Sequence, residues 1–219
     1  MYQLEHIDVD RFTDLLREAK QLEYWDDYFE NLHSQMCKNE YIIQRWWAER
    51  IDLIGKRVNI LNSGVGFFAV PLCFEKGATV VKTYDMCPIT RQLVWRMNKG
   101  YHVKDPEYIP NYFHEVCDVT FDNDKFSYAQ VYINTSVEHS YPMKDIIPDN
   151  CEVVLSGNNL TKRGHINRIE SIEQLIEQSG IKPKDVKYTD EIVLEHDDEL
   201  GIRNYKQFFV YGTKGEWVQ

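Results

Sequence analysis

The spacing of apolar residues divides the chain into a helical first quarter and an alternating remainder. Up to Ile54, apolar side chains recur every three to four residues, and neither Gly nor Pro interrupts them, which is typical of amphipathic helices. One helix is predicted over residues 11–32 and a second over Asn39–Ile54, which Gly55 would end. Residues 1–54 are therefore predicted to form an N-terminal helical cap or lid.

From Gly55 onward, short β-branched runs alternate with helix-like segments, as in a mostly parallel sheet covered on both faces. Five strands are expected, in Arg57–Ser63, Thr79–Asp85, His114–Val119, Tyr128–Ser136 and Cys151–Asn159. Helices are expected in Phe67–Gly77, Pro88–Gly100 and Ser171–Gly180, the last with Ser171 as its N-cap and Gly180 at its end.

The last part of the chain has a different pattern. Two further strands, Val186–His196 and Tyr205–Gly215, flank an acidic connector at Asp197–Asn204, and their spacing favours a long antiparallel hairpin. The predicted fold class is α/β: a doubly wound, mostly parallel, seven-stranded sheet in residues 55–219, with a C-terminal antiparallel hairpin and the N-terminal helical cap.

Composition narrows the class of protein. The chain has 219 residues, 43% of them hydrophobic, which is enough for one sizeable core. It contains no apolar run long enough to span a membrane, and its first residues lack a signal-peptide pattern, so a cytoplasmic location and no membrane partner are expected. The five cysteines form no CxxC pair, and no disulfide framework and no metal site are predicted.

The formal net charge of -10 disfavours a nucleic-acid partner, because an acidic surface repels phosphate backbones. A local basic patch could override this repulsion, and Thr161–Arg168 is the main candidate. That segment is short, and a solvated loop is the favoured interpretation of it.

Candidate chemistry is expected at the carboxyl ends of the strands, where open α/β sheets bind ligands. Gly64 and Gly66 allow a tight turn that approaches a ligand before a helix N-terminus. Asp85 ends the next strand, where a carboxylate can accept both hydroxyls of a ribose, although a helix cap would look the same. Asp118 could accept a hydrogen bond from an adenine amine, or it could be a turn residue.

The fourth strand ends in a dense polar run, Asn134–Ser140. Within it, Glu138 beside His139 could supply a general base or orient a nucleophile. A single histidine is as often structural, but the combination of donors, acceptors and titratable groups favours a site.

The order of these motifs, with "SGVG", "KGATVVKTYDMCP", "CDV", "AQVYINTSVEH" and the final hairpin, resembles class I S-adenosylmethionine-dependent methyltransferases across residues 55–213. The resemblance implies a Rossmann-like methyltransferase fold with S-adenosylmethionine as cofactor. It places the glycines under the methionine part of the cofactor, Asp85 on the ribose, and Asn134 facing the methyl group. The cofactor-binding residues it implies are Asn62, Ser63, Gly64, Gly66, Asp85, Met86, Asp118, Val119 and Asn134.

The motifs "NTSVEH", "SGNN" and "GHIN" together also resemble a group of little-characterised methyltransferase-like proteins from bacteria and viruses. This second resemblance suggests adding Glu138, His139, Asn158, Asn159 and His165 to the site. The catalytic candidates are Asn134, Glu138, His139 and His165, with His165 reaching in from the loop after the fifth strand.

Two departures from the family pattern affect the functional interpretation. Ile60 and Asn62 stand where the family usually has an acid and a glycine, and the fourth strand lacks the D/N-P-P-Y/F run of many enzymes that methylate nucleic-acid amines. The leading hypothesis is methyl transfer to a small-molecule or modest-sized acceptor. The alternative is a non-catalytic binding or assembly protein with an eroded cofactor site.

A dinucleotide-dependent oxidoreductase is disfavoured, because a complete G-x-G-x-x-G motif is missing and the chain ends in a hairpin. The cap and the loop Tyr101–Phe113 are expected to cover the acceptor. The aromatic run Arg45–Arg50 would permit a homodimer contact.

Overall fold

The computed structural model describes residues 37–64, 66–88, 90–91, 94, 111–162, 164–198 and 201–215. The helix expected over residues 11–32 lies outside this part of the chain, as do most of the helix Pro88–Gly100 and most of the loop Tyr101–Phe113. Within the described residues, no helix is both long and apolar enough to cross a membrane.

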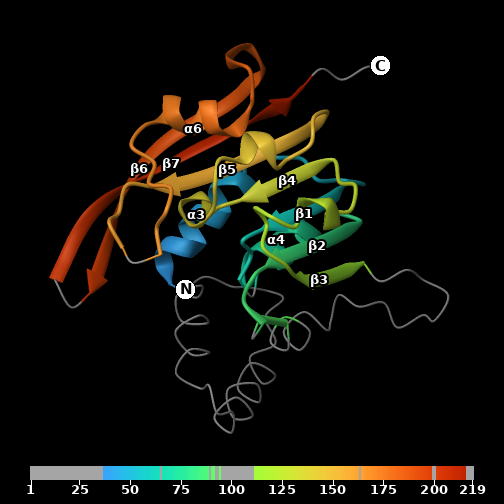
Figure 1. The fold of residues 1–219 in the computed structure, drawn as a ribbon, viewed down its shortest axis with the longest axis horizontal. Helices are drawn as coiled ribbons and strands as arrows, with labels where there is room; N and C mark the ends of the chain where they lie inside the picture. Colours follow the sequence, from blue (N-terminus) through green and yellow to red (C-terminus); the bar gives the residue numbers. More distant parts are fainter. Residues whose placement is uncertain are drawn as a thin grey trace, which may run out of the picture.

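Seven strands form one sheet in the order β3-β2-β1-β4-β5-β7-β6, so the predicted strand number and fold class are confirmed (Figure 1). Strands β1 to β5 run parallel, whereas β7 pairs antiparallel with both β5 and β6. The strands are β1 (Arg57–Leu61), β2 (Val80–Asp85), β3 (Tyr112–Val116), β4 (Val131–Asn134), β5 (Cys151–Asn158), β6 (Val186–Asp198) and β7 (Gly201–Lys214).

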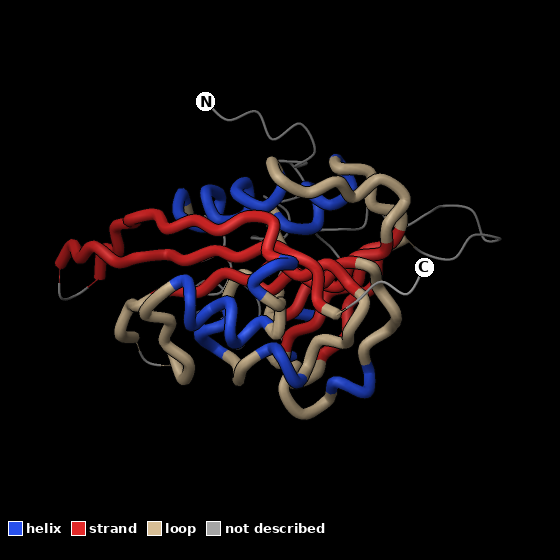
Figure 2. The backbone as a smooth tube through the Cα atoms, turned by 90° about the horizontal axis from the view of Figure 1, so that it is seen from above, coloured by secondary structure: helices blue, strands red, loops and turns tan. Residues whose placement is uncertain are grey.

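Helices cover both faces of the sheet (Figure 2). Among the described residues, the α-helices with defined bounds are α3 (Lys38–Ala48), α4 (Ala69–Glu75) and α6 (Ile172–Ser179), and the short 3₁₀ turns are η2 (Asn123–Lys125), η3 (Val137–His139), η4 (Met143–Asp145) and η5 (Pro183–Asp185). Helices α3 and α4 pack on one face, and α6 packs on the other with η3 and η4. Helix α6 begins and ends as predicted, because Ser171 Oγ accepts a hydrogen bond from the Gln174 amide and Gly180 is left-handed.

The alternation of side chains along each strand divides the core into two layers. In β4, Ile133 packs with α3 and α4, whereas the adjacent Tyr132 packs with the α6 side. In β5, Val154 packs on the side of α3 and α4, and the adjacent Leu155 packs on the α6 side. Because both faces are covered, every residue of β4 and β5 is buried, which explains the apolar runs Val131–Ile133 and Val153–Leu155.

Helix α3 belongs to the core of the sheet. The Trp46 ring stacks on Phe209 of β7 with 4.6 Å between centroids, and its Nε1 donates to Asp190 Oδ2 at 2.9 Å. Trp46 and Trp47 are both buried, so the expectation that their aromatic run would form an exposed dimer contact is wrong. The expected helix end at Gly55 is also wrong: the helix stops at Ala48, after which the chain carries Leu53 into the core.

The terminal hairpin is longer than the sequence pattern predicted. The acidic connector expected at 197–204 is mostly strand, since β6 continues to Asp198 and β7 begins at Gly201. Backbone hydrogen bonds between β6 and β7 satisfy the amide and carbonyl groups of these polar residues. The two strands therefore remain paired beyond the part of the sheet that packs in the hydrophobic core.

All five cysteines are free thiols. Cys73, Cys117 and Cys151 are buried, and burial raises the pKa of each thiol. These three side chains therefore act as small apolar groups of the core.

Candidate cofactor and catalytic site

The loop after β1 makes a sharp turn at the carboxyl edge of the sheet. Asn62, Gly64 and Gly66 all have left-handed backbone, with φ of 49°, 51° and 62°. A Cβ added at Gly66 would lie 2.8 Å from Val70 Cγ2, so this position has no room for a side chain. Gly64 and Gly66 thus form the tight turn that the sequence predicted.

The structure brings Asp85 to this loop. Its Oδ2 accepts a hydrogen bond from the Gly64 amide at 2.7 Å, and its Oδ1 accepts one from the Cys87 amide at 2.9 Å. A carboxylate has about four acceptor sites, so each oxygen keeps capacity for another donor. Burial raises the pKa of Asp85, and the two amide hydrogen bonds oppose that rise. Next to it, Met86 is exposed.

Asp118 and Val119, the predicted adenine contacts, lie after β3. Asp118 Oδ1 accepts a hydrogen bond from the Thr120 amide at 2.9 Å, so the residue stabilises a turn, as the alternative interpretation expected. The Val119 side chain is buried in the core layer on the α6 side. Both residues lie beyond the carboxyl end of a strand that adjoins β2.

Asn134 ends β4 with its side chain completely buried. Its Oδ1 accepts a hydrogen bond from the Ser136 amide at 2.9 Å, and its Nδ2 lies 3.4 Å from Met143 Sδ. These contacts hold the loop after β4. That loop is joined to the β1 loop, because Asn62 Nδ2 donates to the Ser136 carbonyl at 3.3 Å.

Glu138, in η3, is a buried carboxyl group with one oxygen unpaired. Its Oε1 accepts a hydrogen bond from Asn158 Nδ2 at 2.8 Å, whereas its Oε2 is buried without a hydrogen-bond partner. Burial raises the pKa of Glu138 from 4.5 to about 8, and the charge of Glu40 adds to this effect. The group is therefore protonated at pH 7 in the ligand-free protein.

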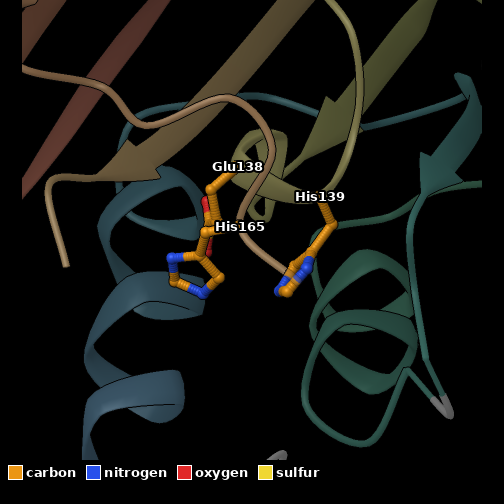
Figure 3. A group of neighbouring side chains, drawn as sticks. All are labelled: Glu138, His139 and His165. Atoms are coloured by element: carbon orange, nitrogen blue, oxygen red, sulfur yellow. The ribbon is translucent and has the colours of Figure 1, made fainter. Parts of the chain in front are cut away.

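His139 and His165 face one another beside Glu138, from the loops after β4 and β5 (Figure 3). Their ring centroids are 4.8 Å apart and the rings are nearly perpendicular. His139 Nδ1 lies 3.2 Å from the Gly164 carbonyl oxygen, and His165 Nδ1 lies 2.8 Å from that of Leu160. A carbonyl can only accept, so each Nδ1 donates and each Nε2 carries a lone pair.

The surroundings of both histidines favour the neutral imidazole. Removal from solvent lowers the pKa of His139 and of His165, although the hydrogen bonds to the carbonyl groups oppose this. The charge of Asp85 also opposes the lowering of the pKa of His139.

The two remaining predicted residues, Asn158 and Asn159, have different partners. Asn158 belongs to the cluster because it donates to Glu138, whereas Asn159 contacts β7, where its Oδ1 accepts a hydrogen bond from the Lys206 amide at 2.8 Å.

Sequence reasoning missed Gln44 of α3, which is buried and donates from Nε2 to Thr135 Oγ1 at 2.8 Å. A polar residue within the apolar stripe of a helix was the signal that could have found it.

Comparison by sequence finds no match: no family model matches the chain, and no curated protein matches it. Comparison by structure finds many solved methyltransferases. Magnesium protoporphyrin IX methyltransferase from Synechocystis, solved with S-adenosylmethionine, aligns with a TM-score of 0.52 and 14% identity over 94% of this chain and 91% of that one.

Two further structures align with a TM-score of 0.54. One is the C-terminal domain of precorrin-6Y C5,15-methyltransferase from Rhodobacter capsulatus, with 9% identity over 82% of this chain and 91% of that one. The other is a proposed RNA methyltransferase from Pyrococcus horikoshii, with 13% identity over 81% and 82% of the two chains. The chain has the fold of class I S-adenosylmethionine-dependent methyltransferases.

Proposed function

We propose that this chain, which has the class I methyltransferase fold, transfers a methyl group from S-adenosylmethionine to a small-molecule or modest-sized acceptor. The observation that carries the proposal is the contact between Asp85 and the Gly64 amide. It places a carboxylate with spare acceptor capacity at the tight loop between β1 and α4, where this fold binds its ligand.

The residues of this edge fit the cofactor. Gly64 and Gly66 would let the backbone approach the methionine part, and Asp85 would accept hydrogen bonds from the ribose hydroxyls. Ser63 and Met86 would flank these positions, and Asp118 and Val119 would hold the adenine. When bound, S-adenosylmethionine supplies a methyl group made electrophilic by its sulfonium charge.

The cluster after β4 handles the acceptor and its proton. At pH 7, His139 Nε2 is a free base with a lone pair, whereas Glu138 is protonated and can donate a hydrogen bond. The His165 ring faces the His139 ring and borders the same space from the opposite side. Asn134 positions the loop that carries these groups, through its bond to the Ser136 amide.

Helix α3 supports the proposed role of residues 1–54 as a cap. Gln44 donates to Thr135, three residues before Glu138, so this helix lies next to the loop after β4. An acceptor bound at the cluster would therefore lie close to α3.

One observation favours the alternative function, a non-catalytic binding protein. Ile60 occupies the place of the family's acidic residue and is buried among α3 and α4, so it offers no polar contact to a cofactor. Without that acidic residue, the first polar side chain after Ile60 is that of Asn62, which already donates a hydrogen bond to the Ser136 carbonyl.

A thermal-shift experiment separates the two functions, because a ligand that binds only the folded chain raises its Tm. S-adenosylmethionine and S-adenosylhomocysteine should each raise the Tm, and NAD should not. If neither sulfur ligand changes the Tm, the non-catalytic function is favoured. With an acceptor in hand, replacing Glu138 and His139 together should abolish turnover while S-adenosylhomocysteine still binds.

A further inference from the structure

Glu138, His139 and His165 form a group of three metal-ligand side chains. One ligand atom of each lies within 4.8 Å of the others, although the residues come from two loops that are distant in sequence (Figure 3). Donors bound to one ion at about 2.0–2.2 Å lie about 3.4 Å apart in tetrahedral geometry. One ligand atom of each residue therefore already lies within about 1.5 Å of the spacing that a shared ion requires.

The two imidazoles are oriented as metal ligands are. Each Nδ1 donates to a backbone carbonyl, of Gly164 or Leu160, which leaves Nε2 free for an ion. Such an outer hydrogen bond fixes the tautomer and the direction of the ring at metal sites. Asn158 Nδ2 donates a hydrogen bond to Glu138 Oε1 and fixes the direction of the carboxyl group in a similar way.

The second, independent observation is the unpaired Oε2 of Glu138. The side chain is 94% buried, and this oxygen has no hydrogen-bond partner. Burying an acceptor without a partner costs about 1–3 kcal/mol, so native structures rarely leave one unsatisfied. An ion held between Oε2 and the two Nε2 atoms would satisfy it.

We propose that Glu138 Oε2, His139 Nε2 and His165 Nε2 bind a first-row divalent transition-metal ion such as Mn²⁺, Co²⁺ or Zn²⁺. Two imidazoles favour these ions, whereas Mg²⁺ and Ca²⁺ prefer oxygen ligands throughout. Three protein ligands leave coordination positions open, as in catalytic rather than structural sites. This proposal differs from the expectation from the sequence, which included no metal site.

The ion would select the acceptor, a step that rests on the proposed methyl transfer. An acceptor hydroxyl bound at an open position becomes more acidic, so the ion replaces His139 as the means of removing its proton. In the transfer, the sulfonium S–C bond breaks with its electron pair going to sulfur. An oxygen lone pair forms the new O–C bond, and the hydroxyl proton passes to water. The acceptor class is thus a molecule with a hydroxyl group near further oxygen donors.

Metal binding can be measured without an acceptor. The full chain, prepared without a polyhistidine tag and stripped by a chelator, would be titrated with Co²⁺ and Mn²⁺. Visible absorption reports bound Co²⁺, electron paramagnetic resonance reports free Mn²⁺, and Mg²⁺ serves as the comparison ion. The expected result is one Co²⁺ or Mn²⁺ per chain, with much weaker binding of Mg²⁺.

Glu138→Gln is the decisive variant, because glutamine has the shape of the protonated carboxyl group and keeps an acceptor for Asn158. Outer-shell partners alone change metal affinity by about 10- to 100-fold, so loss of this ligand should lower it by more than about 10-fold. His165→Gln should behave in the same way. His114→Asn on β3 replaces a histidine outside the cluster and should bind the ion like the wild type.

Each outcome has a separate meaning. No binding of Co²⁺ or Mn²⁺ by the wild type would overturn the metal site, as would unchanged affinity in Glu138→Gln and His165→Gln. Calorimetry with S-adenosylhomocysteine, run with chelator present, tests the cofactor site alone. Failure there contradicts the proposed function and leaves the metal result standing.

Discussion

Replacing Asp85 with Asn is the sharpest single test of the cofactor site. In the ligand-free protein, the carboxylate accepts hydrogen bonds from the amides of Gly64 and Cys87, and each of its oxygens keeps a lone pair for another donor. The substitution keeps the shape but turns one of the two acceptor oxygens into a donor NH₂ group. The NH₂ group can only donate. It therefore cannot accept the hydrogen bond from a backbone amide or from a ribose hydroxyl that the carboxylate oxygen accepts.

The magnitude follows from the bonds at stake. A hydrogen bond to a charged group contributes about 1.5–3 kcal/mol, and Asp85→Asn removes the charge and one acceptor. The Kd for S-adenosylhomocysteine should therefore rise by about 10- to 160-fold. Loss of one amide contact should also lower the free energy of unfolding by about 1 kcal/mol.

Isothermal titration calorimetry measures the Kd, and denaturant unfolding confirms that the variant is folded at the temperature used. Glu191→Gln, on the exposed face of β6, is the matched control and should leave the Kd unchanged. A Kd for Asp85→Asn within threefold of the wild-type value would show that the carboxylate serves only as a cap for the loop after β2.

Two further predictions concern stability. Gly157→Ala should lower the free energy of unfolding by about 1–3 kcal/mol in urea titrations, because the new Cβ would lie 2.4 Å from Val137 Cγ2 in a packed core; an unchanged midpoint would contradict this. Burial opposes the ionisation of Glu152, but hydrogen bonds from Lys187, Lys56 and a tyrosine outweigh it and hold the pKa of Glu152 below its ordinary 4.5. The resulting stabilisation is present above pH 4.5 and is lost as the pH falls through the lower folded-state pKa. The wild type should therefore exceed Glu152→Gln in free energy of unfolding at pH 7 by about 1–2 kcal/mol, and by less at pH 3; a constant difference would refute this assignment.

The strands of the parallel part of the sheet could be predicted because burial on both faces leaves a direct trace in the sequence. The residues of β4 are apolar up to Asn134, and the polar run begins where the strand ends. The extent of the hairpin could not be predicted. Backbone pairing decides it, and side chains such as Val193 and Ile202 remain exposed there, so their polarity carries little information.

The residues of the candidate site could be identified from the sequence more readily than their hydrogen-bond partners and protonation states. Glu138, His139 and His165 are brought together as predicted. Which nitrogen donates, and which oxygen stays unpaired, depends on the carbonyls of Leu160 and Gly164, whose positions only the folded loops determine. For this reason the sequence indicated a general base and gave no sign of a metal site.

Asn134 shows a related limit. Its place at the end of β4 suggested contact with the methyl group, yet its amide group binds the Ser136 amide and approaches Met143. Asparagine at a strand end often hydrogen-bonds the backbone two residues on, and sequence alone cannot distinguish that use from ligand binding.

A crystal structure of the chain with S-adenosylhomocysteine would test the central claim most directly. The account predicts the ligand at the carboxyl ends of β1 and β2, with the ribose hydroxyls within hydrogen-bond distance of Asp85 and the sulfur directed toward the cluster of Glu138, His139 and His165. A ligand bound elsewhere, or crystals grown at saturating ligand that contain none, would contradict it.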